Sequence, residues 1–158
     1  MKITIRKAKP EDIEYVIDLA VEMVGMSISP YRDCLKSQVQ EFRRKDLAVL
    51  KDINSNNNIG IFIASDEDSN FIGHVIVVSG DIESSTGERQ GWIFDISVKE
   101  AYWHCGIGKK LMRHAEEFIK NIGLRYIGMG VTASNERAVR FYERLGYKEE
   151  RKRMIKRL

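Results

Sequence analysis

Apolar and polar residues follow two different periods along the chain, and its first part shows both. Residues 2–7 alternate, with Ile3 and Ile5 on one side, which predicts an opening strand. Pro10, followed by two acidic residues, is typical of a helix start because proline fits the first turn and acids favour its positive end. Apolar residues then recur at helical spacing, namely Ile13, Val16, Ile17, Ala20 and Val24. Ser29-Pro30 predicts the start of a second helix. Its buried stripe is expected to be Leu35, Val39 and Phe42.

From residue 59 the pattern changes to short runs rich in β-branched and aromatic residues. Three strands are predicted over 59–64, 71–78 and 92–98, and the turn-rich segment 81–91 is expected to join the last two as a hairpin. A strong amphipathic helix follows, whose inward residues are expected to be Leu111, Met112, Ala115, Phe118 and Ile119. This helix is predicted over 108–121 and is followed by a strand over 124–132, a helix over 135–145 and a strand over 147–158. Gly123 and Gly146 are expected to cap the two helices at their C-terminal ends.

This order, β-α-α-β-β-β-α-β-α-β, predicts an α/β fold. Strands joined through helices need parallel crossovers, whereas the middle strands can pair antiparallel. A mixed, mostly antiparallel central sheet with helices on both faces follows. The length of 158 residues fits one domain over 1–158, and the asparagine-rich stretch 54–58 is interpreted as a polar loop within it.

Composition and charge narrow the class of protein. The chain has 26 Lys and Arg against 23 Asp and Glu, a net charge of +3 with the signs interspersed, which does not indicate a nucleic-acid partner. No apolar run approaches the ~18 residues of a membrane span, and the start MKITIRKAKPE lacks the apolar block of a secretory signal. We therefore expect a cytoplasmic protein with no membrane partner. Cys34 and Cys105 have no metal-binding spacing and are expected to be free thiols.

The segment 98–109 is the most informative in the chain, because it runs from a strand through two glycines into a helix. Amides at a helix start carry partial positive charge and stabilise an anion, and glycines at 106 and 108 let the backbone approach a phosphate. The alternative is an ordinary strand-to-helix turn with glycines for tight packing. A Walker A loop is excluded, since Trp103 and Lys110 stand where it needs Gly and Ser or Thr. A dinucleotide fingerprint fails at Leu111.

This segment resembles the signature of the Gcn5-related N-acetyltransferases, which is a strand, then Arg or Gln, two residues, Gly, one residue, Gly or Ala, and a helix. The glycines and the topology match, while Trp103 replaces the usual Arg or Gln and His104 a small residue. A second block, NERAVRFYERLGY over 135–147, is similar to the family's Asn, Ala, Phe-Tyr and Gly-Phe/Tyr pattern. Both blocks occur in the family's order, and the resemblance extends over nearly the whole chain.

The resemblance implies the acyl-CoA N-acyltransferase fold and acetyl-CoA as co-substrate, with no metal. It implies that backbone groups of the strand edge at Ile96, Ser97 and Val98 bind the pantetheine arm. The pyrophosphate would lie in a cradle of amides from Trp103, His104, Cys105, Gly106, Ile107 and Gly108. Lys109 or Lys110 could supply the phosphate contact that an arginine at 103 would make. Asn135 would lie near the pantetheine or the substrate, and it also suits a helix cap.

Tyr142 is the predicted catalytic residue. The resemblance implies that it protonates the departing coenzyme A sulfur, and a tyrosine with a pKa near ~10 stays protonated at neutral pH. The alternative is a core aromatic. The base is open: Trp92 stands where histone-modifying members place a glutamate, and Asp95, Asp81, Glu83 and Glu88 are candidates by region. Asp95 is expected to alternate away from a stripe of Trp92, Phe94 and Ile96, and water could also take the proton.

The sequence thus predicts an N-acetyltransferase acting by direct attack of a primary amine, on a small molecule or a peptide. Two rival functions remain. One is a non-catalytic acetyl-CoA sensor, which the residues at 103 and 104 make worth testing. The other is nucleic-acid binding by the basic end of the chain, for which no recognition motif exists. The acceptor is not readable from the sequence, and a homodimer is left open.

Overall fold

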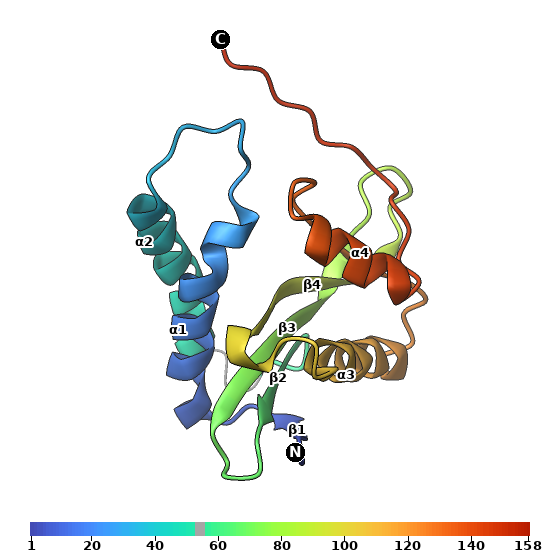
Figure 1. Cartoon of the computed structure of the whole chain (residues 1–158). Coiled ribbons are helices and arrows are strands. Elements are labelled where there is room, and N and C mark those ends of the chain that lie inside the picture. Colours follow the sequence, from blue (N-terminus) through green and yellow to red (C-terminus); the bar gives the residue numbers. More distant parts are fainter. Residues whose placement is uncertain (53–55) are drawn as a thin grey trace.

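A five-stranded sheet in the order β1-β2-β3-β4-β5 separates two pairs of helices in this computed structural model (Figure 1). The structure describes residues 1–52 and 56–158, so part of the predicted loop 54–58 lies outside the described residues. The strands are β1 (Thr4–Lys7), β2 (Ile59–Ser65), β3 (Phe71–Ile82), β4 (Arg89–Val98) and β5 (Ile127–Met129). The helices are α1 (Ile13–Met23), α2 (Lys36–Leu47), α3 (Ile107–Asn121) and α4 (Glu136–Arg144), with short 3-10 turns at Pro10–Asp12, Val24–Ser27, Ala48–Asp52 and Glu100–Tyr102.

The sheet is mixed and mostly antiparallel, as predicted. Strands β1 to β4 pair antiparallel, and β5 joins β4 in parallel because α3 carries the chain back across the sheet. Helices α1 and α2 cover one face, and α3 and α4 cover the other (Figure 1). The expected fold class is therefore confirmed.

Strand alternation divides the core into two layers. Ile63 and Ile76 pack with Val16, Ile17 and Leu47 under α1 and α2. On the opposite face the core beneath α3 consists of Ala64, Ile72, Val75, Val77, Ile93, Ile107, Leu111, Met112, Ala115 and Ile119. The inward stripe predicted for α3 is confirmed, with Phe118 half-buried at its edge. Each layer excludes water from a sheet face, which is the main stabilising contribution to the fold.

The second helix differs from its prediction. Ser29-Pro30 lies in a turn, and α2 begins at Lys36. Phe42 is 68% exposed, so the predicted apolar stripe does not face the core. The inward face carries Gln40, whose amide donates to the Val21 carbonyl at 3.2 Å, and the fully buried Leu47. The prediction of an inward apolar stripe is wrong because this helix packs partly through polar contacts, which the spacing of apolar residues does not reveal.

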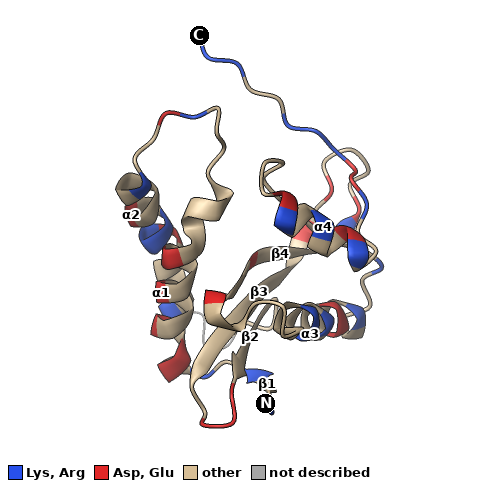
Figure 2. Cartoon of the chain, viewed as in Figure 1, with Lys and Arg blue, Asp and Glu red and all other residues tan. Residues whose placement is uncertain are grey.

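The predicted last strand over 147–158 is also wrong. These residues form no strand and extend away from the sheet, as Figure 1 shows, and Figure 2 shows their basic character. Met154 and Leu158 are fully or almost fully exposed. Charged residues occupy most positions here, so the segment has no apolar face to bury against a sheet. Arg151 instead pairs with Glu83 of the β3–β4 loop, and Arg157 with Asp33.

A shorter correction concerns β5, and two further observations concern membrane insertion and the cysteines. The strand predicted over 124–132 is limited to Ile127–Met129. Among residues 1–52 and 56–158, no helix has the length and apolar character needed to cross a membrane. Cys34 and Cys105 are both free and exposed, as expected.

Candidate active site

The sheet opens between β4 and β5, and this opening gives β4 a free backbone edge. Pairing with β5 covers only Gly91 to Ile93, whereas β3 accompanies β4 as far as Val98. The Lys99 amide donates to the Ile72 carbonyl at 2.9 Å. Because backbone groups alternate sides in an antiparallel strand, those of Ile96 and Val98 point away from β3 into the opening. Those of Ser97 point toward β3, so only two of the three residues expected to bind pantetheine present their backbone there.

A β-bulge at Phe94 lies at the point where the two strands separate. Ile76 is opposite Asp95 while the next residue, Val77, is opposite Ile93, so Phe94 is the extra residue in β4. The bulge reverses the alternation of side chains along the strand. Asp95 therefore lies on the same face as Trp92, under α1 and α2, and the prediction that it alternates away from a Trp92, Phe94 and Ile96 stripe is wrong.

Asp95 is the centre of a buried polar network. One carboxylate oxygen accepts from Arg43 of α2 at 2.6 Å. The other lies 2.7 Å from His74 Nε2 and accepts from the Ser97 hydroxyl at 3.1 Å. Burial alone would raise the pKa of Asp95, but the His74 hydrogen bond and the charges of His74 and Arg43 hold it below its ordinary value. A carboxylate held in the ionised form by three partners is a poor proton acceptor.

Sequence reasoning missed His74 and Arg43. His74 is fully buried in β3, and its Nδ1 has no hydrogen-bond partner among the described residues. The sequence feature that could have indicated His74 as a site residue is a single histidine inside an otherwise apolar strand. Arg43 gave no signal, because a basic residue in a polar helix is ordinarily solvated.

The loop between β4 and α3 carries amides that are free of hydrogen bonds. The first bond of α3 runs from Lys110 N–H to Gly106 O at 3.2 Å. Within the described part of the chain, no carbonyl or side chain accepts from the amides of residues 104–109. Four free amides are normal at a helix start, and here they continue back through the loop. This arrangement fits a diphosphate, which needs several donors and is stabilised at the positive end of a helix.

The two glycines of this loop have different structural roles. Gly106 has a φ of +74° and open space where a Cβ would stand, so it shapes the turn and leaves the cradle clear. At Gly108 a Cβ would lie 3.1 Å from the Phe141 ring of α4. The packing explanation offered by the alternative interpretation therefore holds for Gly108 and not for Gly106. His104 also has a positive φ, +65°, which is uncommon for a residue with a side chain.

The side chains around the loop are placed as follows. Trp103 folds back toward the strand, and its indole N–H donates to the Val98 carbonyl at 2.7 Å. Ile107 is buried and anchors the loop in the core. His104, Cys105 and Lys109 are exposed. No ion pair involves Lys109 within the described residues.

Helix α4 places Asn135 and Tyr142 beside this opening. Asn135 is the N-cap, and its side chain accepts from the Ala138 amide at 3.2 Å. Tyr142 is half-buried between Phe141 and Tyr147, whose ring centroids lie 5.2 and 6.1 Å from its own. Among the described residues, no group hydrogen-bonds the Tyr142 hydroxyl. Burial and the negative charge of Asp95 raise the pKa of Tyr142 to about 12, against a lowering by the charge of Arg137.

The other candidate bases have structural partners. Asp81 accepts from the Gln90 amide at 2.7 Å, and Glu88 pairs with Arg125 at 2.7 Å. Glu83 accepts from the Ser85 and Thr86 amides at 3.0 and 2.8 Å and pairs with Arg151. All three lie at the β3–β4 hairpin and hold its shape.

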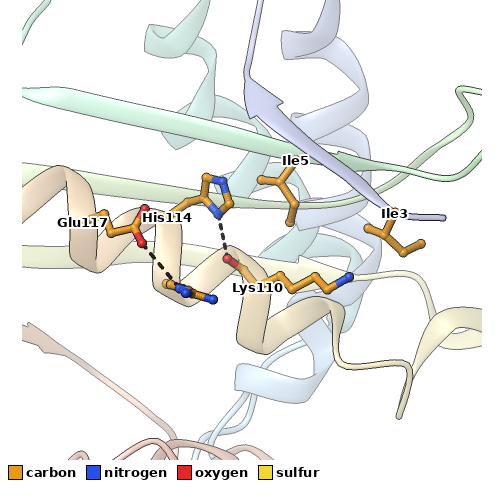
Figure 3. A pocket seen from close by; sticks show the side chains of 6 residues that line it. Ile3, Ile5, Lys110, His114 and Glu117 are labelled. Carbon is orange, nitrogen blue, oxygen red and sulfur yellow. Dashed lines mark hydrogen bonds and ion pairs between the residues drawn. The ribbon is translucent and has the colours of Figure 1, made fainter.

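Two further features lie outside this arrangement. A hollow of about 310 Å³ lies between β1 and α3, and of the candidate site residues only Lys110 lines it (Figure 3). Its lining consists of Ile3, Ile5, Lys110, Arg113, His114 and Glu117. Within residues 1–52 and 56–158, no three His, Cys, Asp or Glu side chains form a metal-binding group.

Comparison with known proteins gives consistent matches. The profile of the acetyltransferase (GNAT) family matches residues 27–147. A spermidine N(1)-acetyltransferase from Thermoplasma acidophilum is 28% identical over 95% of this chain and 91% of its own length. An N-alpha-acetyltransferase 30 from Schizosaccharomyces pombe is 37% identical over 54% of this chain and 55% of its own. A solved structure of a putative acetyl transferase from Pyrococcus furiosus is 29% identical, with a TM-score of 0.81 over 99% of this chain and 100% of that one.

Proposed function

We propose that this chain, which belongs to the GNAT family of acetyltransferases and is an acyltransferase, transfers the acetyl group of acetyl-CoA to a primary amine by direct attack. The observation that carries the proposal is the run of unbonded amides over residues 104–109, which lies beside an open strand edge. Together they offer donors for a diphosphate and a backbone template for an amide-containing arm.

The residues of this chain would divide the binding of the co-substrate between them. Acetyl-CoA supplies an acetyl thioester, which is activated toward attack by a neutral amine. Ile96 would bind its pantetheine arm through its backbone N–H and C=O, and Val98 through its N–H, since both residues point into the opening and the Val98 carbonyl already accepts from the Trp103 indole. The amides of the loop, supported by the dipole of α3, would bind the diphosphate. Asn135 would act mainly through α4, whose first turn it caps.

Tyr142 would act as the general acid. During transfer, a bond forms between the amine nitrogen and the acetyl carbon, and the carbon–sulfur bond breaks. The sulfur leaves with the electron pair and takes a proton from the Tyr142 hydroxyl, while the nitrogen loses a proton to water. A hydroxyl with no acceptor among the described residues is free to donate, and its raised pKa keeps it protonated.

No dedicated base is assigned. Asp95 is held ionised by Arg43 and His74, and its lowered pKa makes it a weak base. An α-amino group with a pKa of ~8 is neutral in roughly one molecule in ten at pH 7, whereas a lysine near ~10.4 is neutral in only about one in two to three thousand. Water is therefore sufficient for an acceptor of the first kind.

The relatives indicate that the acyl acceptor carries an amino group, but they do not agree on one acceptor molecule. The names of similar proteins refer to spermidine, to protein N-termini and to streptothricin. All of these present an amino group, so we propose a primary amine on a small molecule or a peptide. A cytoplasmic location would suit such an acceptor and an acetyl-CoA supply.

The test is release of the coenzyme A thiol in the presence of spermidine, a peptide α-amine and streptothricin. We expect turnover with one of these classes, and a loss of at least about 10²-fold in kcat for Tyr142→Phe, the usual contribution of a general acid. Tyr147→Phe is the matched control, because its hydroxyl donates to Glu116 at 2.9 Å, and it should retain turnover. Full activity of Tyr142→Phe across pH 6–9 would show that the acid is a different group.

A non-catalytic sensor of acetyl-CoA is the rival function, favoured by the unusual Trp103 and His104. The same experiment separates the two, because a sensor would bind acetyl-CoA and acetylate none of the amines. Mass spectrometry after incubation with acetyl-CoA alone tests the mechanism of transfer. Direct attack predicts no covalent acetyl-enzyme intermediate, whereas an acetyl group bound to the protein and then passed to an added amine would contradict it.

A further inference from the structure

Trp103 has a fixed side chain at the entrance of the phosphate loop. Its backbone amide donates to the Glu100 carbonyl at 3.0 Å, and its indole N–H donates to the Val98 carbonyl at 2.7 Å. These two bonds hold the ring against the end of β4, so its free face is a rigid platform next to the unbonded amides of residues 104–109.

Arg137 of α4 lies on that platform. Its guanidinium carbon is 3.6 Å from the centre of the Trp103 ring, the distance of a close cation–π stack. The stack joins the first turn of α4 to the first residue of the loop, which are separated by the whole of α3 and β5 in the sequence. A stacked guanidinium keeps its edge N–H groups available, since stacking uses only its planar face.

The charge of Arg137 is not neutralised by an acid. Within the part of the chain that the structure describes, no carboxylate lies in ion-pair distance of it. Arg140, one turn later on the same helix, pairs with Glu136 at 2.9 Å and so shows the ordinary solvated arrangement. Arg137 is exposed, and its charge also reaches Tyr142, where it lowers the pKa of the phenol. Its positive charge therefore acts both beside the loop, at Trp103, and on the predicted acid.

We propose that Arg137, held on the face of Trp103, binds the diphosphate of acetyl-CoA and supplies the side-chain contact that the family signature assigns to Arg or Gln at position 103. The proposal rests on the proposed function. A guanidinium offers two parallel N–H donors to phosphate oxygens, which a lysine at 109 or 110 does not. The substitution at 103 then moves the cation from the loop to α4, with the indole as its support.

Calorimetric titration of coenzyme A into Arg137→Gln tests this contact directly. We expect a loss of affinity of about tenfold or more, as for a charge-assisted hydrogen bond. Arg140→Gln removes the same charge from the same helix and should bind with unchanged affinity, and Lys109→Gln should lose less than Arg137→Gln. The double variant Trp103→Arg with Arg137→Gln should regain affinity relative to Arg137→Gln alone.

Fragments of the ligand identify the group that is contacted. The loss in Arg137→Gln should be the same for 3′-dephospho-coenzyme A and should vanish for pantetheine, measured by competition. A loss that vanishes with 3′-dephospho-coenzyme A would place the contact at the 3′-phosphate and overturn the proposal. A loss that persists with pantetheine would show a structural role and overturn it as well. Equal affinity of Arg137→Gln and the wild type would overturn this inference alone, whereas no binding to the wild type would overturn the proposed function with it.

Discussion

The surroundings of the Tyr142 hydroxyl determine its pKa and therefore the pH range in which it can donate a proton. Burial is the largest influence, and with the charge of Asp95 it raises the pKa of the phenol to about 12. An acid must be protonated to act, so the fraction of competent enzyme falls only as the pH approaches this value. With an ordinary pKa of ~10 it would fall from about pH 9 upward.

We therefore expect kcat with an α-amine acceptor to rise as the amine loses its proton and then to stay level to about pH 10.5. The measurement is kcat at saturating acetyl-CoA from pH 6 to 10.5. A descending limb with an apparent pKa near ~10, present in the wild type and absent in Tyr142→Phe, would contradict the raised pKa.

Asp95 is expected to stabilise the fold instead of accepting a proton. Asp95→Asn leaves the Arg43 guanidinium without its closest, mostly buried partner, and should lower the free energy of unfolding by about 3 kcal/mol. The matched control is Asp46→Asn, which removes the second, more exposed partner of Arg43 at 3.3 Å and should change it by less than about 0.5 kcal/mol. Urea unfolding measures both, and equal effects would show that the network is not specific to Asp95.

The pH dependence of that difference has a definite sign. The folded pKa of Asp95 lies below its ordinary value, so its stabilisation is complete above the unfolded value of ~3.9 and is lost as the pH falls through the folded one. The difference in free energy of unfolding between wild type and Asp95→Asn should therefore be present at pH 5 and shrink below about pH 4. A difference that grew on acidification would refute the assignment.

At the scale of elements, the contact between α3 and β4 is close enough to exclude a single methyl group. A Cβ at Gly91 would lie 2.5 Å from Cγ1 of Ile119. Gly91→Ala should therefore destabilise the protein by about 1–3 kcal/mol through overpacking, seen as a lower urea midpoint. Gly80→Ala is the control, since no atom lies within 4 Å of its Cβ position, and it should be neutral. Equal stability of the two variants would mean that α3 can move away from the sheet.

Elements with a clear apolar period were predictable, and those governed by polar contacts were not. Strands β1 to β4 and α3 have clear apolar patterns and formed close to their expected bounds, whereas β5 is shorter than the strand predicted over 124–132 and no strand forms over 147–158. Helix α2 turns Gln40 and Arg43, not Phe42, toward the protein, so its apolar spacing predicted the wrong inward face. The Phe94 bulge could not be predicted from the sequence, because a single extra residue in a strand leaves no compositional signal. It nevertheless moves Asp95 to the other face of the sheet.

At the scale of the whole molecule, the candidate site joins segments that are distant in the sequence. The loop and Tyr142 could be proposed from two motif blocks, because glycines and aromatic residues at fixed spacing leave a local signal. The contact of Arg137 with Trp103 and the network around Asp95 depend on how α4 and α2 pack against the sheet. Such contacts are set by tertiary geometry, which no local pattern in one sequence records.

The central claim is that the loop at the start of α3 binds acetyl-CoA. Calorimetric titration of acetyl-CoA into ligand-free protein tests it most directly, with Gly106→Glu to place a negative charge in the cradle. Gly87→Glu is the matched control, because Gly87 has a similar positive φ and open surroundings in the β3–β4 loop. We expect micromolar binding to the wild type and to Gly87→Glu, and none to Gly106→Glu. A well-folded wild type that does not bind, or equal binding by Gly106→Glu, would contradict the account.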